Sequence, residues 1–206
     1  MPSTGRFIVV DGGEGAGKSS FLSFCRQELS ASEYEFVREP GGVRAAEKIR
    51  ELLFHPETGA GVLTEFLLFW TARAEVIEKV IGPALAMGKN VICDRFDSST
   101  FAYQVRGRQR PDLVSVFEQM REISCGAVKP YLYLFFDLDP RVGLARAKGR
   151  GDGNFFDEEQ LEFHERVRRG YHEFFEGRRH QVIDASRSER EVFETALSAV
   201  RSACIS

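Results

Sequence analysis

The stretch Gly12-Gly13-Glu14-Gly15-Ala16-Gly17-Lys18-Ser19 decides the fold of this chain. It follows an apolar run at 7–10 and leads into a second one that begins at Phe21, so strand, turn and helix follow each other with the spacing G-x-x-x-x-G-K-[ST]. Glycines let the backbone turn tightly and point several N–H groups at one polyphosphate. The helix adds the positive end of its dipole. The spacing predicts a phosphate-binding loop, with Lys18 reaching the β- and γ-phosphates of a nucleotide and Ser19 as a Mg²⁺ ligand.

The composition is that of an ordinary globular protein. With 206 residues, of which 43% are hydrophobic and 29% charged, one domain over 1–206 with a full core is expected. The formal net charge of −3 argues against a dedicated nucleic-acid binder, which is normally distinctly basic. Basic residues cluster at 106–110, 141–150 and 166–169, and such local clusters suit either a small polyanion or a solvated helix face.

The cysteines and the apolar runs indicate in which cellular compartment the protein is expected. The four cysteines show no paired spacing and no zinc pattern, so buried thiols in a reducing compartment are expected. The N-terminus lacks an apolar signal region, and the longest apolar run, at 131–136, is too short to span a bilayer. We therefore expect a cytoplasmic protein without a membrane or nucleic-acid partner.

Strand-like and helical patterns alternate along the chain. Strand-like runs occur at 6–11, 34–38, 90–94, 131–137 and 180–184. Helical periodicity occupies about 17–30, 43–54, 62–87, 111–125, 140–148, 157–177 and 188–203. The alternation predicts an α/β fold, a doubly wound five-stranded parallel sheet flanked by helices. Pro83 predicts a bend or break in the helix over 62–87.

Residues that follow the strands are the candidates for function, because ligands of open α/β sheets bind beyond the carboxyl ends of the strands. Arg38 to Gly42 follow the second strand, and Asp94 and Arg95 end the third. Asp94 fits a Mg²⁺ ligand or a helix N-cap, and the nearby phosphate loop favours the metal. Arg95 can clamp a phosphate with two N–H groups.

Phe69 and Arg73 lie four residues apart, on one face of the helix predicted over 62–87. The pattern alone fits Phe69 as a core residue or as a platform for a ligand ring. It likewise fits Arg73 as a surface residue whose stem covers apolar side chains. Further motifs are needed to choose between these interpretations.

Taken in order, the motifs resemble those of the thymidylate kinase family, specifically its bacterial type. The matching residues are Asp11 to Ser19, Arg38-Glu39-Pro40-Gly41-Gly42, Leu67-Leu68-Phe69-Trp70-Thr71-Ala72-Arg73, Asp94-Arg95-Phe96, Ser99-Thr100-Phe101-Ala102-Tyr103-Gln104 and Asp137-Leu138-Asp139-Pro140. The resemblance covers residues 6 to 200 or so in one register. It implies a P-loop nucleoside monophosphate kinase that transfers the γ-phosphoryl group of ATP to dTMP, with Mg²⁺ required and a homodimer as the assembly.

The resemblance also implies roles for single residues. Phe69 is expected to stack on the thymine ring, Arg73 to bind a thymine carbonyl, and Tyr103 to crowd the 2′ position and so favour deoxyribose. Arg95 is expected to grip the acceptor phosphate and the transferring group, with Glu14 near the acceptor sugar. The other implied acceptor-site residues are Arg38, Pro40, Ser99, Thr100 and Gln104. The implied ATP-site residues are Gly12, Gly13, Glu14, Gly15, Ala16, Gly17, Lys18, Ser19, Ser20, Ala185 and Ser186.

The bacterial type carries its charge-stabilising arginines in a lid rather than in the phosphate loop. Here Gly15 stands where other members have arginine, and the basic, glycine-rich sequence predicts a mobile lid over about 146–157. Arg150 and Arg146 are the catalytic arginines expected from this lid. Phe155 stands where relatives commonly have arginine, which leaves open which lid cation reaches the phosphates.

Two other functions fit parts of the pattern. Another deoxynucleoside or nucleoside monophosphate kinase would share the phosphate loop, and a nucleoside kinase would need Glu14 or Asp94 as a carboxylate base. A non-catalytic nucleotide-binding protein would be expected to lose Arg95 or the basic lid. Arg38 and Arg95 favour an acceptor that already bears a phosphate, and hence dTMP over thymidine.

Overall fold

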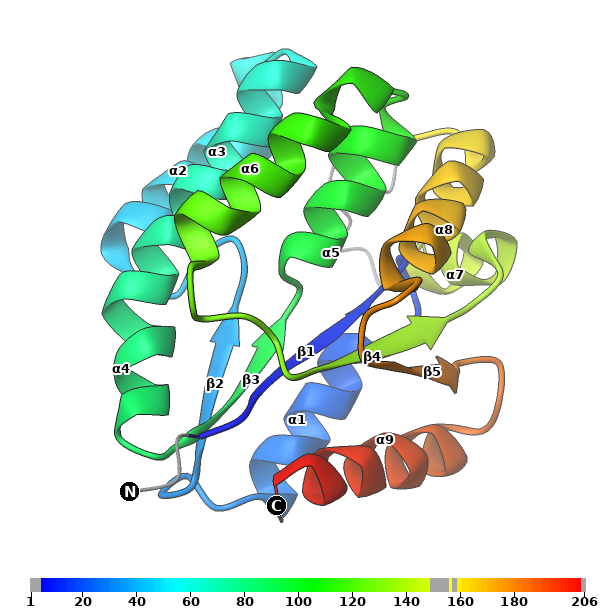
Figure 1. Cartoon of the computed structure of the whole chain (residues 1–206). Helices are drawn as coiled ribbons and strands as arrows, with labels where there is room; N and C mark the ends of the chain where they lie inside the picture. The colour runs from blue at the N-terminus through cyan, green and yellow to red at the C-terminus, as the bar shows by residue number, and fades with distance from the viewer. Residues whose placement is uncertain (1–4, 149–155, 157–158, 205–206) are drawn as a thin grey trace.

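The computed structural model describes residues 5–148, 156 and 159–204. Within these residues five strands form one parallel sheet in the order β2-β3-β1-β4-β5 (Figure 1). The strands are β1 (Phe7–Gly12), β2 (Tyr34–Arg38), β3 (Asn90–Asp94), β4 (Leu132–Asp137) and β5 (His180–Asp184). The expected doubly wound five-stranded parallel sheet is confirmed, and β1 lies at its centre.

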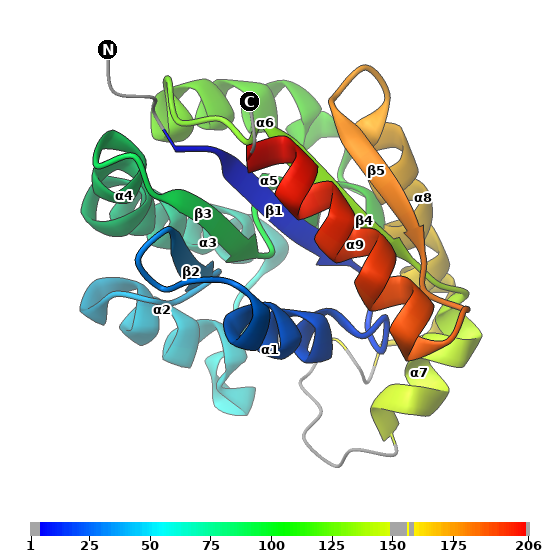
Figure 2. The same ribbon diagram turned by 90° about the horizontal axis from the view of Figure 1, so that it is seen from below.

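Helices cover both faces of the sheet. On one face lie α1 (Lys18–Glu28) and α9 (Glu189–Cys204), both in front of the strands in Figure 2. The other face carries α2 (Arg44–Phe54), α3 (Val62–Val76), α4 (Gly82–Ala86), α5 (Asp97–Thr100), α6 (Val114–Cys125) and α8 (Leu161–Phe175), while α7 (Pro140–Lys148) follows β4. Short 3₁₀ helices occupy Pro56–Thr58 and Pro111–Leu113. Within the described ranges, no helix is long and apolar enough to cross a membrane.

The central strand shows why the strand sequences are continuously apolar. Successive side chains of a strand point to opposite faces of the sheet, so Phe7 and Val9 of β1 pack into the core beneath α3, α6 and α8. Ile8 and Val10 pack into the core beneath α1 and α9. Because both faces are covered, every position of β1 is buried.

The helix predicted over 62–87 is divided into α3, a π-helical segment η2 (Ile77–Ile81) and α4. Pro83 lies in the first turn of α4 and has no N–H with which to continue the α-helical ladder. The N–H of Gly82 bonds to the carbonyl of Ile77, five residues earlier, as in a π-helix. The expected interruption at Pro83 therefore takes the form of a π segment.

The segment that follows β3 is helical, although the sequence patterns predict no helix there. It consists of α5 and a π-helical segment η3 (Phe101–Gly107) that packs against α8. The residues of η3 from Phe101 to Val105 are all buried. A helix that is covered on all sides has no polar face, and it therefore lacks the periodicity by which an amphipathic helix is predicted.

Phe117 on α6 offers a test of the core. Its side chain is 0% exposed, and its ring contacts those of Trp70, Phe101 and Phe174. We expect Phe117→Ala to lower the free energy of unfolding by about 3–5 kcal/mol, measured by urea denaturation, because the cavity cannot close fully. Ile123→Ala on the same helix, where the side chain is 79% exposed, is the control. A loss at Phe117 no larger than that of the control would contradict this packing.

Candidate active site

The phosphate loop joins β1 to α1. Gly17 precedes the helix with a φ of 89°, a left-handed conformation that glycine adopts without strain. Lys18 begins the helix, and its ammonium donates hydrogen bonds to the carbonyl oxygens of Gly12 (2.9 Å) and Gly13 (2.6 Å). Burial and the nearby Arg95 lower the pKa of Lys18 to about 8, although neighbouring carboxylates oppose the change. A bound polyphosphate would favour the charged form of this lysine.

The loop also packs directly against α7. Gly15 has a φ of +67°, and a Cβ atom there would lie 2.1 Å from the carbonyl oxygen of Gly143. A Cβ atom on Gly143 would lie 2.2 Å from the carbonyl oxygen of Glu14. The backbones of the loop and α7 are in direct contact at Gly15 and Gly143, so the side chain of an arginine does not fit at position 15. Cations other than Lys18 that stabilise the phosphates are therefore expected from outside the loop.

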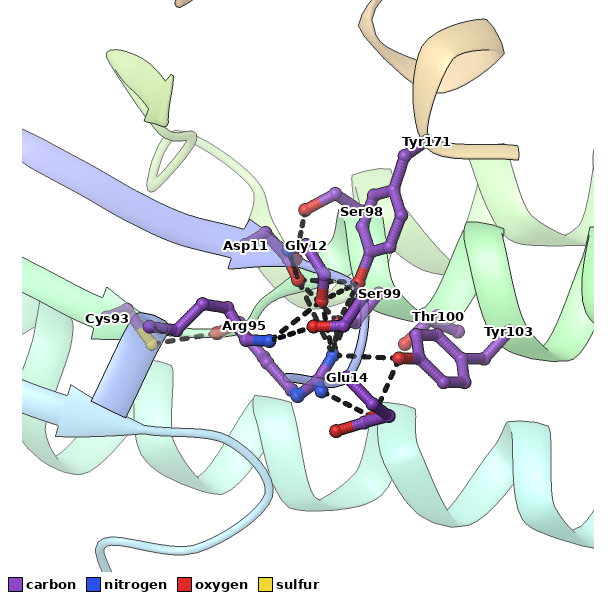
Figure 3. Close-up of polar contacts among 12 residues, drawn as sticks. Asp11, Gly12, Glu14, Cys93, Arg95, Ser98, Ser99, Thr100, Tyr103 and Tyr171 are labelled. Atoms are coloured by element: carbon purple, nitrogen blue, oxygen red, sulfur yellow. Dashed lines mark hydrogen bonds and ion pairs between the residues drawn. The ribbon is translucent and has the colours of Figure 1, made fainter. Parts of the chain in front are cut away.

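Arg95 lies at the centre of a cluster of polar side chains beyond the ends of β1 and β3 (Figure 3). Its Nη2 atom is 2.7 Å from Oε1 of Glu14, and the same oxygen accepts a hydrogen bond from the hydroxyl of Tyr103 at 2.8 Å. Its Nη1 atom donates to the carbonyl oxygen of Gly12 (3.2 Å) and the hydroxyl of Ser99 (3.1 Å). The φ of Arg95 is 64°, a strained value for a non-glycine residue. Arg95 thus has a strained backbone conformation, and its guanidinium is bound to Gly12 and Glu14 of the phosphate loop.

The charge of Glu14 is fixed by its surroundings. Burial alone would raise its pKa, but the positive charges of Arg95 and Lys18 and the hydrogen bond from Tyr103 outweigh burial and lower the pKa to about 2. A carboxylate with so low a pKa is a weak proton acceptor near neutral pH. Glu14 is therefore better suited to holding Arg95 than to serving as a general base.

Asp11, near the end of β1, anchors this cluster, a role that is not predictable from the sequence alone. Its fully buried carboxylate accepts hydrogen bonds from the hydroxyls of Ser98 (2.6 Å), Ser99 (2.8 Å) and Tyr171 (2.6 Å) and from the N–H of Gly12 (2.9 Å). Figure 3 shows these groups around Arg95. Tyr171 belongs to α8 and is 160 residues away in sequence, so no local motif could predict that it joins the site.

Arg73 is 1% exposed, which excludes the interpretation of this residue as a surface arginine. Its Nε donates to Oε2 of Glu39 at 2.8 Å, and its Nη2 to the hydroxyl of Thr100 at 3.0 Å. Its Nη1 is buried without a hydrogen-bond partner among the described residues. A buried donor without a partner is costly. Arg73 and Thr100, both predicted acceptor-site residues, are not among the residues that line the cavity beside the phosphate loop.

A cavity of about 500 Å³ extends from the phosphate loop to the end of the site near Phe69. The predicted site residues that line it are Glu14, Gly15, Ala16, Gly17, Lys18, Ser19, Ser20, Arg38, Pro40, Phe69, Asp94, Arg95, Ser99, Tyr103 and Gln104. Arg50, Phe54 and Phe156 also line it, although no motif in the sequence points to them. The ring of Phe156 packs edge-on against that of Tyr103, with 5.2 Å between ring centroids.

Arg38 is less enclosed than the other acceptor-site candidates. Its side chain is 50% exposed and forms an ion pair with Glu47 at 2.9 Å. Arg50 donates a hydrogen bond to the carbonyl oxygen of Pro40 at 3.0 Å, so it places a second cation at the same end of the cavity. Arg50 has no motif of its own in the sequence, which is why only the structure identifies it.

The candidates for the adenine side and the lid lie elsewhere. Arg146 on α7 donates a hydrogen bond to the carbonyl oxygen of Ala185 at 3.2 Å, so α7 contacts the segment that follows β5. Ser186 in that segment is exposed, and its hydroxyl donates to Asp184 at 2.5 Å. Arg150 and most of the lid expected at 146–157 lie outside the described residues.

The residues expected to bind Mg²⁺ both line the cavity, the hydroxyl of Ser19 at the start of α1 and the carboxylate of Asp94 at the end of β3. Mg²⁺ prefers oxygen ligands and usually takes one or two from the protein, with water and substrate phosphates as the others. In the described part of the chain, no three His, Cys, Asp or Glu side chains form a group that could hold a metal by themselves. The donor set therefore fits a Mg²⁺ ion that arrives with a nucleotide.

These elements define the class of protein. A glycine-rich loop leads from the central parallel strand into a helix, and a buried lysine and an arginine from the adjacent strand end converge on one cavity. Such a combination binds a nucleoside polyphosphate and stabilises a phosphoryl group in transfer. The protein is a P-loop kinase that acts on nucleotides.

Comparisons with known proteins identify the family. The thymidylate kinase family model matches residues 10–196. The chain is 40% identical over 209 residues to a thymidylate kinase of Shouchella clausii, covering 95% of this chain and 94% of the relative. It is 43% identical over 201 residues to one of Caulobacter vibrioides, covering 95% of each. The crystal structure of thymidylate kinase from Ehrlichia chaffeensis matches 96% of this chain and 99% of its own, with a TM-score of 0.75 and 27% identity. The chain belongs to the thymidylate kinase family, whose activity is the phosphorylation of dTMP to dTDP with ATP.

The low pKa of Glu14 predicts how folding stability depends on pH. Its pKa falls from 4.5 to about 2 on folding, so the unfolded chain binds this proton more readily than the folded one. The stabilisation is full above about pH 4.5 and is lost as the pH falls towards about 2. In Glu14→Gln, we expect the loss of unfolding free energy over this pH range to be smaller than in the wild type by about 3 kcal/mol.

Denaturant unfolding at each pH measures this difference. Glu194→Gln on α9 is the matched control, because the side chain of Glu194 is 61% exposed and its removal should leave the acid profile unchanged. Parallel acid profiles for the wild type and Glu14→Gln would contradict the charge assigned to Glu14.

Proposed function

We propose that the protein is one catalytic domain in which an in-line transfer moves the γ-phosphoryl group of ATP to the phosphate of dTMP. The observation that carries this proposal is the continuous cavity, with the phosphate loop at one end, Phe69 and Gln104 at the other, and Arg95 between them. The attacking atom is an oxygen of the acceptor phosphate, so no protein nucleophile is needed. Catalysis then rests on positioning and on the stabilisation of charge.

At the donor end, the backbone N–H groups of residues 12–20 and the ammonium of Lys18 hold the phosphates of ATP. Ser19 and Asp94 would hold Mg²⁺, directly or through water, and the bound ion would neutralise charge on the β- and γ-phosphates. The segment at Ala185 and Ser186 lies beside the adenine. The exposure of Ser19 within the cavity lining supports this arrangement.

At the point of transfer, Arg95 contacts both the moving phosphoryl group and the acceptor phosphate. Glu14 and Tyr103 hold its guanidinium before substrate arrives, so little reorganisation is needed during the reaction. The lid at about 146–157 brings Arg146 and Arg150 towards the phosphates when it closes. This division of cations is supported by the contact between Gly15 and Gly143, which leaves no room for an arginine at position 15.

At the acceptor end, Phe69 stacks on the thymine ring, and Arg73 donates to a thymine carbonyl from its unpartnered Nη1. Thr100 supports Arg73, and Gln104 contacts the other edge of the base. Tyr103 occupies the space that a 2′-hydroxyl would need. The remaining acceptor-site residues are Ser99, Arg38 and Pro40, which line the same cavity.

The low pKa of Glu14 favours a nucleoside monophosphate over a nucleoside as the acceptor. A sugar hydroxyl needs a base to remove its proton. Of the two candidate bases, Glu14 is bound to Arg95 and has a pKa of about 2, and Asp94 is assigned to Mg²⁺. The phosphate oxygen of dTMP is already ionised and needs no such base. The polar cluster around Arg95 thus suits an anionic acceptor.

We also propose that the protein is a homodimer formed through α2 and α3, which pack against each other. Three leucines on these helices face solvent, Leu52 (47% exposed), Leu63 (48%) and Leu67 (43%). A second copy of the chain would cover them. The same helices carry Phe69 and Arg73, so a dimer would brace the acceptor end of the site.

An ATP-consumption assay with Mg²⁺ tests the proposed reaction, with dTMP, dUMP, dCMP, dGMP, dAMP, UMP and thymidine as acceptors. We expect kcat/KM for dTMP to exceed that for dCMP and the purine nucleotides by about 100-fold or more, because a mispaired buried polar group discriminates strongly. Lys18→Ala is the control for contaminating kinases and should be inactive. A preference for thymidine would contradict the proposal and would require a carboxylate base.

Light scattering tests the dimer. At micromolar concentration we expect a mass near twice the 23.3 kDa of one chain, and Leu67→Glu should shift the protein to monomer because it places a charge in the apolar contact. Val182→Glu on β5, where the side chain is 47% exposed, is the control and should not change the mass. A wild-type mass near that of one chain would refute the dimer.

A further inference from the structure

Glu65 is a buried carboxylate to which the reaction described above assigns no part. It lies in the first turn of α3, with 4% of the residue exposed. Its Oε1 accepts a hydrogen bond from Nε2 of Gln104 at 2.7 Å, and its Oε2 lies 3.4 Å from Nη2 of Arg108. Arg108 also forms an ion pair with Glu159. The contact between Glu65 and Gln104 joins α3 to η3 directly behind the acceptor end of the cavity.

The chemistry of a carboxylate determines which way the Gln104 amide points. An ionised carboxylate can only accept hydrogen bonds, whereas an amide has one end that donates and one that accepts. The NH₂ group of Gln104 must therefore face Glu65, and its carbonyl oxygen is the atom left for the cavity that Gln104 lines. Burial raises the pKa of Glu65, and the hydrogen bond from Gln104 and the guanidinium of Arg108 beside Oε2 oppose this change by favouring the ionised form.

We propose that Glu65 is a positioning residue for base selection, which fixes the Gln104 amide so that its carbonyl oxygen accepts a hydrogen bond from the N3–H of a thymine ring. This inference rests on the proposed function, in which the base of dTMP lies between Phe69 and Gln104. Glu65 does not touch the substrate. It acts through the orientation of Gln104.

The pair Arg73 and Gln104 then forms a pattern that matches thymine and rejects cytosine. Thymine presents an acceptor, O4, next to a donor, N3–H, whereas cytosine presents a donor, the 4-amino group, next to an acceptor, N3. Arg73 can only donate, and in the proposed function its unpartnered Nη1 donates to O4. The amide of Gln104 is the member of this pair that could be reversed, so the residue that holds its orientation decides how the N3 position is read.

Glu65→Gln tests this role with almost no change in side-chain shape. Gln at position 65 would have one accepting and one donating end. Arg108 donates and would take the oxygen, which would leave the new NH₂ group facing Gln104. The Gln104 amide would then have to turn and present its own NH₂ group to the cavity, which matches N3 of cytosine instead of N3–H of thymine.

For Glu65→Gln, we expect KM for dTMP to rise and the ratio of kcat/KM for dTMP to that for dCMP to fall by about tenfold or more. KM for ATP should not change, because the phosphate loop is untouched. Glu159→Gln is the matched control, since it removes the other carboxylate of Arg108 without touching Gln104. An equal fall in Glu159→Gln would overturn the proposal, because the effect would then come from the charge of Arg108.

A double-mutant cycle separates positioning from a general structural role. If Glu65 acts through Gln104, the double variant Glu65→Gln/Gln104→Leu should discriminate between dTMP and dCMP no worse than Gln104→Leu alone. Additive losses would overturn the proposal. Should Glu65→Gln not fold, Glu65→Asp takes its place: the shorter side chain moves the carboxylate away from Gln104 and releases its amide, so a lowered preference for dTMP supports the proposal and an unchanged preference overturns it.

The wild type distinguishes failure of this inference from failure of the proposed function. If the wild type prefers dTMP over dCMP and Glu65→Gln has the same preference, only the role of Glu65 is wrong. If the wild type accepts both nucleotides equally well, the assignment of the base site is wrong, and the role of Glu65 is overturned with it.

Discussion

The site depends on one constraint, the in-register parallel pairing of β1 with its neighbours. Val10 of β1 pairs with Asp94 of β3, and Asp94 pairs with Arg38 of β2. The hydrogen bonds of this ladder continue past the strand ends, from the N–H of Arg95 to the carbonyl of Val10 at 3.0 Å and from the N–H of Glu39 to the carbonyl of Asp94 at 2.9 Å. The backbone itself therefore places the phosphate loop, Arg95 and Glu39 side by side.

Charge balance follows from this placement. Lys18 and Arg95 are brought together at the end of β1, and two cations this close raise each other's energy. The negative charge of Glu14, within the loop, offsets that repulsion. Nη1 of Arg95 also forms an ion pair with Asp11 and donates a hydrogen bond to the hydroxyl of Tyr171. The cations are thus held in place before a phosphate binds, which is the condition under which charged groups are most effective in phosphoryl transfer.

At the acceptor end, too, polar side chains are held in place by neighbouring residues before a substrate binds. Arg73 is held by Glu39 from the end of β2 and by Thr100 from α5, and Gln104 is held by Glu65 from α3. The two polar side chains that are proposed to contact the base, Arg73 and Gln104, each have a buried partner from another element. Such partners limit the side chain to one orientation, which a site needs if it is to discriminate between bases of similar shape.

The sequence by itself determined the phosphate loop, the parallel sheet and the residues at the strand ends. These features are local, because a glycine spacing, an apolar run and a strand-end carboxylate are each encoded within about ten residues. The helix over 97–107 was not predictable in this way, since burial on all sides removed its periodicity. Only the tertiary structure decided that Tyr171 joins Asp11, that Arg73 is buried against Glu39, and that Glu65 faces Gln104. Those partners lie on different elements, and packing, rather than any local pattern, brings them within hydrogen-bonding distance.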